Sequence, residues 1–342
     1  MNEQIGEDNQ LYEHHKVVAD KGQEPLRVDK FLLNRIEGTS RNKLQQAASD
    51  GFIHVNGKVV KSNYRVKAND IVTVMFSNPP REIELIPQDI PLNIIYEDND
   101  VLVLNKEAGM VVHPGYGNYK DTLVNALAFH VQNLPLNGGD ATRPGLVHRI
   151  DKNTTGLMVI AKNNESLTSL SKQFFDRTID RRYNALVWGE PKQDSGTIEG
   201  NIGRSLKNRK VMSVFEDGSY GKNATTHFKI LEKFGYLSLV ECKLETGRTH
   251  QIRVHFQYIK HPLFNDSEYG GDRILKGTTF SKYKQFVENC FKIIPRQSLH
   301  AKSLAFHHPK TGEWMQFESE LPSDMKEVIK KWRAYSIHKR IS

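Results

Sequence analysis

A single carboxylate stands among basic residues in segment 143–162, which reads RPGLVHRIDKNTTGLMVIAK. At the centre of this segment, Asp151 follows Arg149 by two residues in a polar turn. A nearby cation favours the charged form of a carboxylate, so we expect Asp151 to stay ionised. An ionised carboxylate can act as a nucleophile, whereas it has no proton to donate. Asp151 is therefore the first candidate for a catalytic residue.

The flanking residues indicate how this carboxylate would be held. Pro144 and Gly145 precede the turn, and the apolar run Leu157–Ala161 follows it. A polar turn that ends in a short apolar run is typical of a loop leading into a buried strand. Side chains that carry out chemistry are commonly placed on loops that a rigid scaffold supports.

Two other interpretations of the same residues have to be weighed. The run Asp151–Thr155 also fits an ordinary polar turn in which the carboxylate caps a helix. The catalytic loop of protein kinases needs His-Arg-Asp, but Ile150 occupies the place of that aspartate. No Gly-rich phosphate loop precedes the segment, so the kinase interpretation fails.

The segment resembles the signature of the RluA/RluD family of pseudouridine synthases, which is His-Arg-Leu-Asp, a polar pair and Thr-Ser-Gly. This chain has Ile150 in place of the leucine and Thr155 in place of the serine, and both changes are mild. The resemblance extends over about residues 90 to 325. Further blocks of the family follow in its order: Val112–Gly115, Asp121–Leu127, Arg182–Gly189, Thr246–His255, His261–Leu263, Tyr269–Gly271 and Leu299–Ala301.

The resemblance implies a catalytic role for three residues. Asp151 matches the family's catalytic aspartate, and Tyr183 matches the tyrosine that stacks on the target base. Arg248 matches the basic residue that pairs with the aspartate and orients it. Whether Asp151 attacks the ribose at C1′ or assists formation of a glycal intermediate stays open.

Other basic residues of the same blocks would face the RNA or support the loop. Arg149 matches a residue whose planar guanidinium can enter the base stack of the RNA helix, at the place that the flipped base has left. His148 is also expected to lie near the RNA, and its main expected role is to support the loop. His113, Arg253 and His255 are expected behind the catalytic residues or facing the RNA.

The part of the chain that follows the first ninety residues is predicted to be mixed α/β and rich in strands. The family's fold is α+β, with a mixed, largely antiparallel central sheet, flanking helices and the active site in a cleft across the sheet. The periodicity of apolar residues agrees with this fold. Strands are expected at Val101–Leu104, Leu157–Ala161, Tyr183–Val187 and Leu237–Leu244, and helices at Thr122–Val131, around Leu167–Phe175 and at Gln251–Ile259.

A small α/β module is predicted ahead of this part. Val28, Phe31, Leu32 and Ile36 fall at helical spacing, and a second helix is expected to begin after Ser40. The pair Asn56-Gly57 then predicts a hairpin. This order of elements resembles the RNA-binding domain of ribosomal protein S-four. Its expected phosphate contacts are Arg27, Lys30, Arg41, Lys43 and Lys58.

Charge is distributed unevenly along the 342 residues, whose formal net charge is +8. Residues 25–76 hold nine Lys and Arg against four Asp and Glu, which favours an acidic partner such as nucleic acid. We expect an acidic flexible tail at 1–24, the RNA-binding domain at 25–76, a linker at 77–90, the catalytic domain at 91–325 and a basic extension at 326–342. Residues 272–298 resemble an insertion relative to shorter family members.

Several classes of protein are excluded or disfavoured. The chain has no Rossmann glycine fingerprint, P-loop or Cys/His metal cluster, so a cofactor-free isomerisation fits. Its two cysteines, Cys242 and Cys290, indicate no disulfide framework, and a reduced cytoplasmic setting is expected. The N-terminus is polar and acidic, unlike a signal peptide, and no apolar run approaches the ~18–20 residues of a membrane span.

The leading interpretation is an RNA pseudouridine synthase that acts on large-subunit ribosomal RNA, as a monomer by default. The alternatives are a transfer-RNA pseudouridine synthase and a non-catalytic RNA-binding factor of ribosome assembly. A sugar hydrolase would need a second carboxylate beside Asp151, and the motifs offer none.

Overall fold

The computed structural model divides the chain into two compact units, Met1–Glu82 and Ile83–Ser342, called here the N-terminal and C-terminal units. No helix in the described part of the chain is long and apolar enough to cross a membrane. The structure describes residues 11–36, 39–76, 85–115, 118–136, 142–206, 208, 211–218 and 220–341, with side chains in the last helix up to Ile337.

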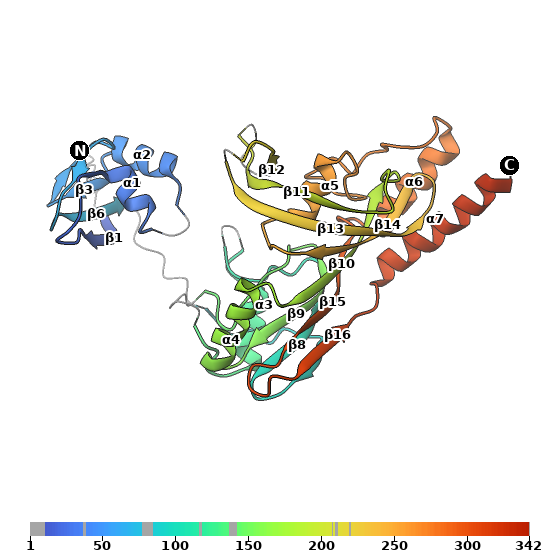
Figure 1. The fold of residues 1–342 in the computed structure, drawn as a ribbon, viewed down its shortest axis with the longest axis horizontal. Coiled ribbons are helices and arrows are strands. Elements are labelled where there is room, and N and C mark those ends of the chain that lie inside the picture. Colours follow the sequence, from blue (N-terminus) through green and yellow to red (C-terminus); the bar gives the residue numbers. More distant parts are fainter. Residues whose placement is uncertain are drawn as a thin grey trace, which may run out of the picture. The chain divides into compact units, whose positions relative to one another are not determined.

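The N-terminal unit contains a four-stranded sheet in the order β1-β6-β3-β4, a separate β2-β5 pair and two helices (Figure 1). Its elements are β1 (Tyr12–Val18), β2 (Leu26–Arg27), α1 (Val28–Leu33), α2 (Arg41–Ser49), β3 (Ile53–Val55), β4 (Lys58–Val59), β5 (Arg65–Val66) and β6 (Ile71–Phe76).

The predicted helices and hairpin of this unit are confirmed. Ser40 caps α2, because its hydroxyl accepts a hydrogen bond from the backbone N–H of Lys43. Asn56 and Gly57 both have positive φ, 50° and 77°, which matches the two-residue turn that suits a hairpin. The apolar faces of the helices and strands form one buried cluster around Phe31.

The prediction of a flexible tail over residues 1–24 was wrong for Tyr12–Val18. This segment is β1, which pairs antiparallel with β6 along its length. Its residues are mostly exposed or half-buried, so the backbone ladder rather than side-chain burial holds the strand at the edge of the sheet. The first ten residues lie outside the described part of the chain.

The C-terminal unit is built on one large sheet with the strand order β12-β11-β13-β14-β10-β15-β9-β8-β7, and β16 pairs with β15. The pairs are antiparallel except β15 with β9, so the predicted mixed, largely antiparallel sheet is confirmed. Figure 1 shows α3 and α4 beside β8 and β9, and α5 beside β11 and β13.

The bounds of these elements agree with most of the predicted ranges. The strands are β7 (Ile94–Glu97), β8 (Val101–Lys106), β9 (Thr155–Ala161), β10 (Asp180–Trp188), β11 (Ser195–Arg204), β12 (Met212–Phe215), β13 (Lys222–Lys233), β14 (Leu237–Leu244), β15 (Leu299–His307) and β16 (Trp314–Glu318). The helices are α3 (Leu123–His130), α4 (Asn164–Phe175), α5 (Gln251–Tyr258), α6 (Ser281–Ile293) and α7 (Ser323–Ile341).

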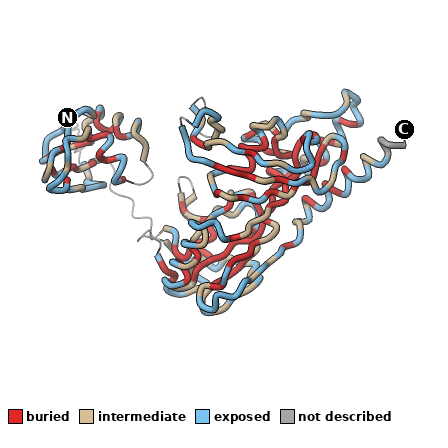
Figure 2. Tube along the Cα trace, viewed as in Figure 1, coloured by how far each residue is buried: buried red, intermediate tan, exposed pale blue. Residues whose placement is uncertain are grey.

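The Asp151 loop is held by the buried strand that follows it, β9, which lies between β15 and β8. All seven residues of β9 are buried, which explains why the sequence shows a continuous apolar run there. Figure 2 shows the buried residues concentrated along the central strands. Gly156 is required where β9 meets β15, since a Cβ there would lie 2.3 Å from the carbonyl oxygen of Ala301.

The last helix corrects the prediction of a basic extension at 326–342. Helix α7 buries Val328, Ile329 and Trp332 in a cluster with α6 and the strands β10 and β14. In the sequence, the buried residues of this helix appear only as scattered apolar residues among lysines. The positive charge of the segment therefore led to the prediction of an exposed extension. Residues up to Ile337 therefore belong to the C-terminal unit.

A linker was predicted at 77–90. Its residues 77–84 lie outside the described part of the chain, so this part of the prediction is not tested. The rest of the segment is attached to the C-terminal unit. The backbone N–H of Gln88 donates to the carbonyl of Asn125 in α3, and the Asn125 side chain donates to the carbonyl of Ile86.

Candidate active site

A cavity of about 510 Å³ opens where the Asp151 loop, the end of α4, β10 and the start of α5 meet. This volume falls within the range of about 300–1,000 Å³ that is typical of small-molecule sites. The cavity is cationic, because its lining holds five arginines against two carboxylates. Its charged lining residues are Asp151, Glu245, Arg149, Arg177, Arg181, Arg248 and Arg253.

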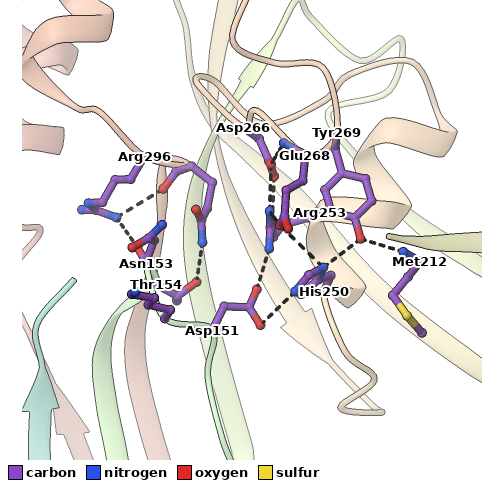
Figure 3. A network of polar contacts seen from close by, with 12 residues as sticks. Asp151, Asn153, Thr154, Met212, His250, Arg253, Asp266, Glu268, Tyr269 and Arg296 are labelled. Carbon is purple, nitrogen blue, oxygen red and sulfur yellow. Dashed lines mark hydrogen bonds and ion pairs between the residues drawn. The ribbon is translucent and has the colours of Figure 1, made fainter. Parts of the chain in front are cut away.

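Asp151 is held by the first residues of α5. The Nη1 of Arg253 donates to Oδ2 of Asp151 at 3.2 Å, and the Nε2 of His250 lies 3.8 Å from Oδ1 (Figure 3). The first distance is a hydrogen bond and the second is beyond one. The Oδ1 atom of Asp151 is thus the carboxylate oxygen not bound by the guanidinium.

Arg253 is fixed by more than Asp151. Its Nε and Nη2 donate to the two carboxylate oxygens of Asp266 at 2.7 and 2.8 Å, and Nη2 also donates to Glu268. The guanidinium lies over the ring of Tyr269. Burial disfavours its charge, but the hydrogen bonds and attraction of Asp266, with Asp151 and Glu268, outweigh burial and hold the pKa of Arg253 above its usual value.

This geometry corrects the prediction that Arg248 pairs with Asp151. Arg248 lines the cavity, but its Nε donates to the carbonyl of Asn223 at 3.0 Å. The partner of Asp151 is Arg253, which the sequence analysis placed behind the site or facing the RNA. Because Arg253 lies inside α5 and is buried, it cannot contact a phosphate at the surface.

Two buried basic side chains hold the backbone of the Asp151 loop. Nζ of Lys106 donates to the carbonyl of Lys152, and Nη1 of Arg296 donates to the carbonyl of Asn153, both at 3.0 Å. Arg296 is itself clamped by both carboxylate oxygens of Asp324. Burial lowers the pKa of Lys106 to about 7. These contacts fix the conformation of the loop that carries Asp151.

Tyr183 projects from β10 into the same cavity. It is 6% exposed, and burial raises the pKa of its hydroxyl above the usual value. The hydroxyl has no hydrogen-bond partner within the described ranges, which leaves it available to a bound molecule. The structure therefore brings Asp151 and Tyr183 together from loops and strands thirty-two residues apart in sequence.

The two basic residues before Asp151 have different surroundings. His148 accepts a hydrogen bond from the N–H of Val159 and stacks on Phe174, so it supports the loop and does not present a charge to RNA. Burial lowers the pKa of His148 to about 3. Arg149 is exposed at the cavity, and its Nη1 lies 2.7 Å from Nε2 of His113.

Sequence reasoning missed a polar chain behind Asp151. The hydroxyl of Tyr269 accepts from the N–H of Met212 at 3.0 Å and lies 2.8 Å from Nδ1 of His250 (Figure 3). Because this hydroxyl accepts from Met212, it can donate its own proton to Nδ1 of His250. A neutral imidazole that accepts at Nδ1 carries its proton on Nε2, the atom that faces Asp151. His250 also has φ 56°, an uncommon backbone conformation at the N-cap residue that precedes α5.

Arg177, Arg181 and His255 complete the placement of basic residues. Arg177 and Arg181 line the cavity and were not singled out from the sequence, because nothing distinguishes them there from surface arginines. His255 is fully buried and lies 2.9 Å from the hydroxyl of Thr226, and burial lowers its pKa to about 4. It therefore supports α5 and does not face RNA.

The candidate phosphate contacts of the N-terminal unit divide into two groups. Arg27 and Arg41 both pair with the buried carboxylate of Asp29, at 3.0 and 2.9 Å. Their hydrogen bonds hold the pKa of Asp29 well below its usual range although burial alone would raise it. Lys30, Lys43 and Lys58 are exposed, so they remain the candidates for contact with phosphates.

One group of side chains could be considered for a metal ion. Asp98, Asp100 and His308 bring possible ligand atoms within 4.8 Å of one another. Both oxygens of Asp98 already accept hydrogen bonds, from the backbone of Asp100 and Val101 and from the side chains of Tyr96 and His308. The group is explained as the support of the turn between β7 and β8.

Known proteins share these features over most of the chain. The family model described as RNA pseudouridylate synthase matches residues 100–258, and that of the S4 domain matches residues 26–72. An "Uncharacterized RNA pseudouridine synthase" of Chlorobaculum parvum is 48% identical over 323 residues, covering 92% of this chain and 96% of the relative. A protein of Zymomonas mobilis named "Ribosomal large subunit pseudouridine synthase D" is 41% identical over 311 residues, covering 89% and 93%.

A solved structure has the same fold. "Human RNA Pseudouridylate Synthase Domain Containing 4" superimposes with a TM-score of 0.52 at 24% identity, covering 70% of this chain and 93% of that one. The motifs around Asp151, the sheet that carries them and the extent of the similarity lead to one assignment. The chain belongs to the RluA/RluD family of RNA pseudouridine synthases that carry an N-terminal S4 domain.

Proposed function

We propose that the cavity around Asp151 isomerises uridines of large-subunit ribosomal RNA in the cytoplasm, by an aspartate-dependent reaction on a flipped base. The observation that carries this proposal is the oriented carboxylate of Asp151, bound by Arg253 in a cavity whose charged lining residues are five arginines and two carboxylates. A cationic cavity suits a phosphate-bearing substrate. The names of the Zymomonas mobilis relative and of others at about 40% identity support ribosomal RNA as the substrate.

In this proposal each catalytic side chain has a task. The reaction breaks the bond from C1′ to N1 of uracil, rotates the detached base and joins C1′ to C5. C5 then loses its proton and N1 takes up a proton, so the nucleotide gains and loses no atom overall. Because Arg253 binds Oδ2, Oδ1 is the oxygen that acts on the sugar, either by attack at C1′ or by assisting formation of a glycal. Tyr183 contacts the base and limits its position while it rotates.

The target uridine has to leave its stack to enter this cavity. Enzymes that act on a base pay a few kcal/mol for its extrusion, least where the base is already unpaired. Arg149 is exposed at the mouth of the cavity and is held by His113. A planar guanidinium in this position can occupy the space that the flipped base leaves.

The test of this function is pseudouridine mapping of total RNA from cells that lack the protein. We expect one or more sites in large-subunit ribosomal RNA to disappear and to return when the wild-type protein is restored. Loss confined to transfer RNA would overturn the proposed substrate but not the reaction. No lost site at all would contradict the reaction itself.

The exposed lysines of the N-terminal unit supply a smaller prediction. A full-length variant with Lys30, Lys43 and Lys58 changed to Gln should bind RNA more weakly and less salt-dependently. Each lost phosphate contact lowers the slope of log affinity against log salt by about 0.7–0.9. Three contacts therefore predict a decrease of about 2–3, measured by titration at several salt concentrations.

The matched control changes three exposed lysines of the predicted insertion, Lys282, Lys284 and Lys292 on α6. None of the described residues of 272–298 lines the cavity, so this variant should keep the wild-type slope. Equal slopes in the wild type and the first variant would remove the RNA-binding role of Lys30, Lys43 and Lys58.

A further inference from the structure

We propose that Phe175 is a stacking platform for a nucleobase of the substrate RNA that lies next to the target uridine. The proposal rests on the proposed function, because it supposes an RNA in the cavity. It adds a binding site for a second nucleotide, outside the residues that act on the uridine.

Phe175 is an unusually exposed aromatic side chain at the mouth of this cavity. It is the last residue of α4 and is 85% exposed, yet it belongs to the cavity lining. Single exposed apolar residues are common on protein surfaces and need no explanation by themselves. The position of this one beside a cationic active site is what distinguishes it.

The neighbouring ring of Phe174 shows the contrast. His148 stacks on Phe174 with ring centroids 4.8 Å apart, and the guanidinium of Arg181 lies 5.0 Å from its centroid. Phe174 is therefore committed to holding the loop before Asp151. Consecutive residues of a helix point about 100° apart, so Phe175 takes no part in this packing and presents its ring to solvent.

Arginine side chains line the same cavity as this ring. Arg177 follows Phe175 by two residues in a left-handed conformation, with φ 59°, and Arg149 lines the cavity as well. Arg177 pairs with Glu245 at 3.4 Å, and both side chains are about half exposed. Such a pair is weak in water, so a phosphate can compete for the guanidinium.

An exposed aromatic ring beside guanidinium groups is a device for binding single-stranded nucleic acid. The ring stacks on a base of any sequence, while the cations contact the backbone. The unpaired bases of an RNA loop are splayed out and can stack on an aromatic side chain. A neighbouring base is therefore the occupant that fits Phe175 by chemistry and by place.

The first experiment measures binding of a fluorescein-labelled oligouridine of about 12 nucleotides to full-length protein carrying Asp151→Asn, which leaves the probe unaltered. Phe175→Ala should weaken binding about 5- to 150-fold, the range found when one base loses an aromatic partner. Phe175→Trp should retain affinity because it keeps a planar ring. Phe175→Leu should resemble Phe175→Ala, because it is apolar but cannot stack.

The matched control is Phe280→Ala. Phe280 is 73% exposed and precedes α6, outside the lining of the active-site cavity. Its removal should leave affinity within about twofold of the parent protein. Equal affinity of the Phe175→Ala and Phe280→Ala variants, or full affinity with Phe175→Leu, would overturn the stacking proposal.

A second measurement separates this proposal from the proposed function. Single-turnover isomerisation is measured with a stem-loop RNA that contains the uridine mapped in cells, using proteins with intact Asp151. A wild-type protein that makes no pseudouridine would refute the function, while the oligouridine titration would still decide the role of Phe175. Active wild-type protein with a slower Phe175→Ala variant, restored by Phe175→Trp, supports both.

Discussion

Asp151→Asn should abolish isomerisation, lowering the single-turnover rate by about 10⁴-fold, while RNA affinity stays within about tenfold of wild type. The asparagine keeps the shape of the side chain and can still contact Arg253, so the loop should keep its conformation. It removes the negative oxygen that we propose acts on C1′. The measurement is single-turnover conversion of a substrate RNA, with affinity measured on the same preparation.

The control for this prediction is Glu245→Gln, a second carboxylate in the lining of the same cavity. Glu245 pairs with Arg177 and His227 through partly exposed side chains, and such pairs contribute about 0–1 kcal/mol. Its rate should stay within about fivefold of wild type. Normal turnover by Asp151→Asn would show that the carboxylate has no chemical role.

The Asp151 loop and its strand could be predicted from the sequence because their signals are local. A polar turn followed by a wholly apolar run leaves few alternatives to a loop and a buried strand, and the structure has β9 at Thr155–Ala161. The placement of Tyr183 in the same cavity depends on strand pairing far along the chain. Only the order of the family's motifs indicated it.

The partner of Asp151 could not be identified in the same way. Arg248 and Arg253 are five residues apart in one basic block, and both were expected to be near the site. Which of the two arginines pairs with Asp151 depends on Asp266 and Glu268. Both lie in the loop after α5 and hold Arg253 in place. Contacts between separate elements carry no periodic signal in the sequence.

Two elements were missed because their composition resembles a solvated surface. Strand β1 holds two histidines and a lysine among its seven residues and depends on the backbone ladder with β6. Helix α7 is rich in lysine and buries a narrow face around Trp332. A local excess of charge therefore gives little information about whether a segment packs.

Arg253→Gln should be the most damaging single change after substitution of Asp151 itself. Arg253 is the buried cation that faces Asp151, Asp266 and Glu268 together. Removing one member of a buried ion pair leaves uncompensated charge and costs about 3–5 kcal/mol of stability. Isomerisation should also fall by about 100-fold or more, because small displacements of a reacting group are that costly.

A second substitution distinguishes the loss of stability from the loss of catalysis. In Arg253→Gln with Asp266→Asn, the buried negative charge that faced the arginine is removed as well, so thermal stability should recover in part. Turnover should remain low, since Asp151 still lacks its guanidinium partner. Recovery of turnover together with stability would mean that Arg253 matters only for folding.

Arg248→Gln is the matched control, because it removes a second arginine from the same cavity lining. Arg248 binds the carbonyl of Asn223 and no carboxylate of the described residues, so stability should change by less than about 1 kcal/mol. RNA affinity should fall modestly. The slope of log affinity against log salt should decrease by about 0.7–0.9, the change expected for one lost phosphate contact. If Arg248→Gln abolished turnover while Arg253→Gln spared it, the ion pair between Arg253 and Asp151 would have no catalytic role.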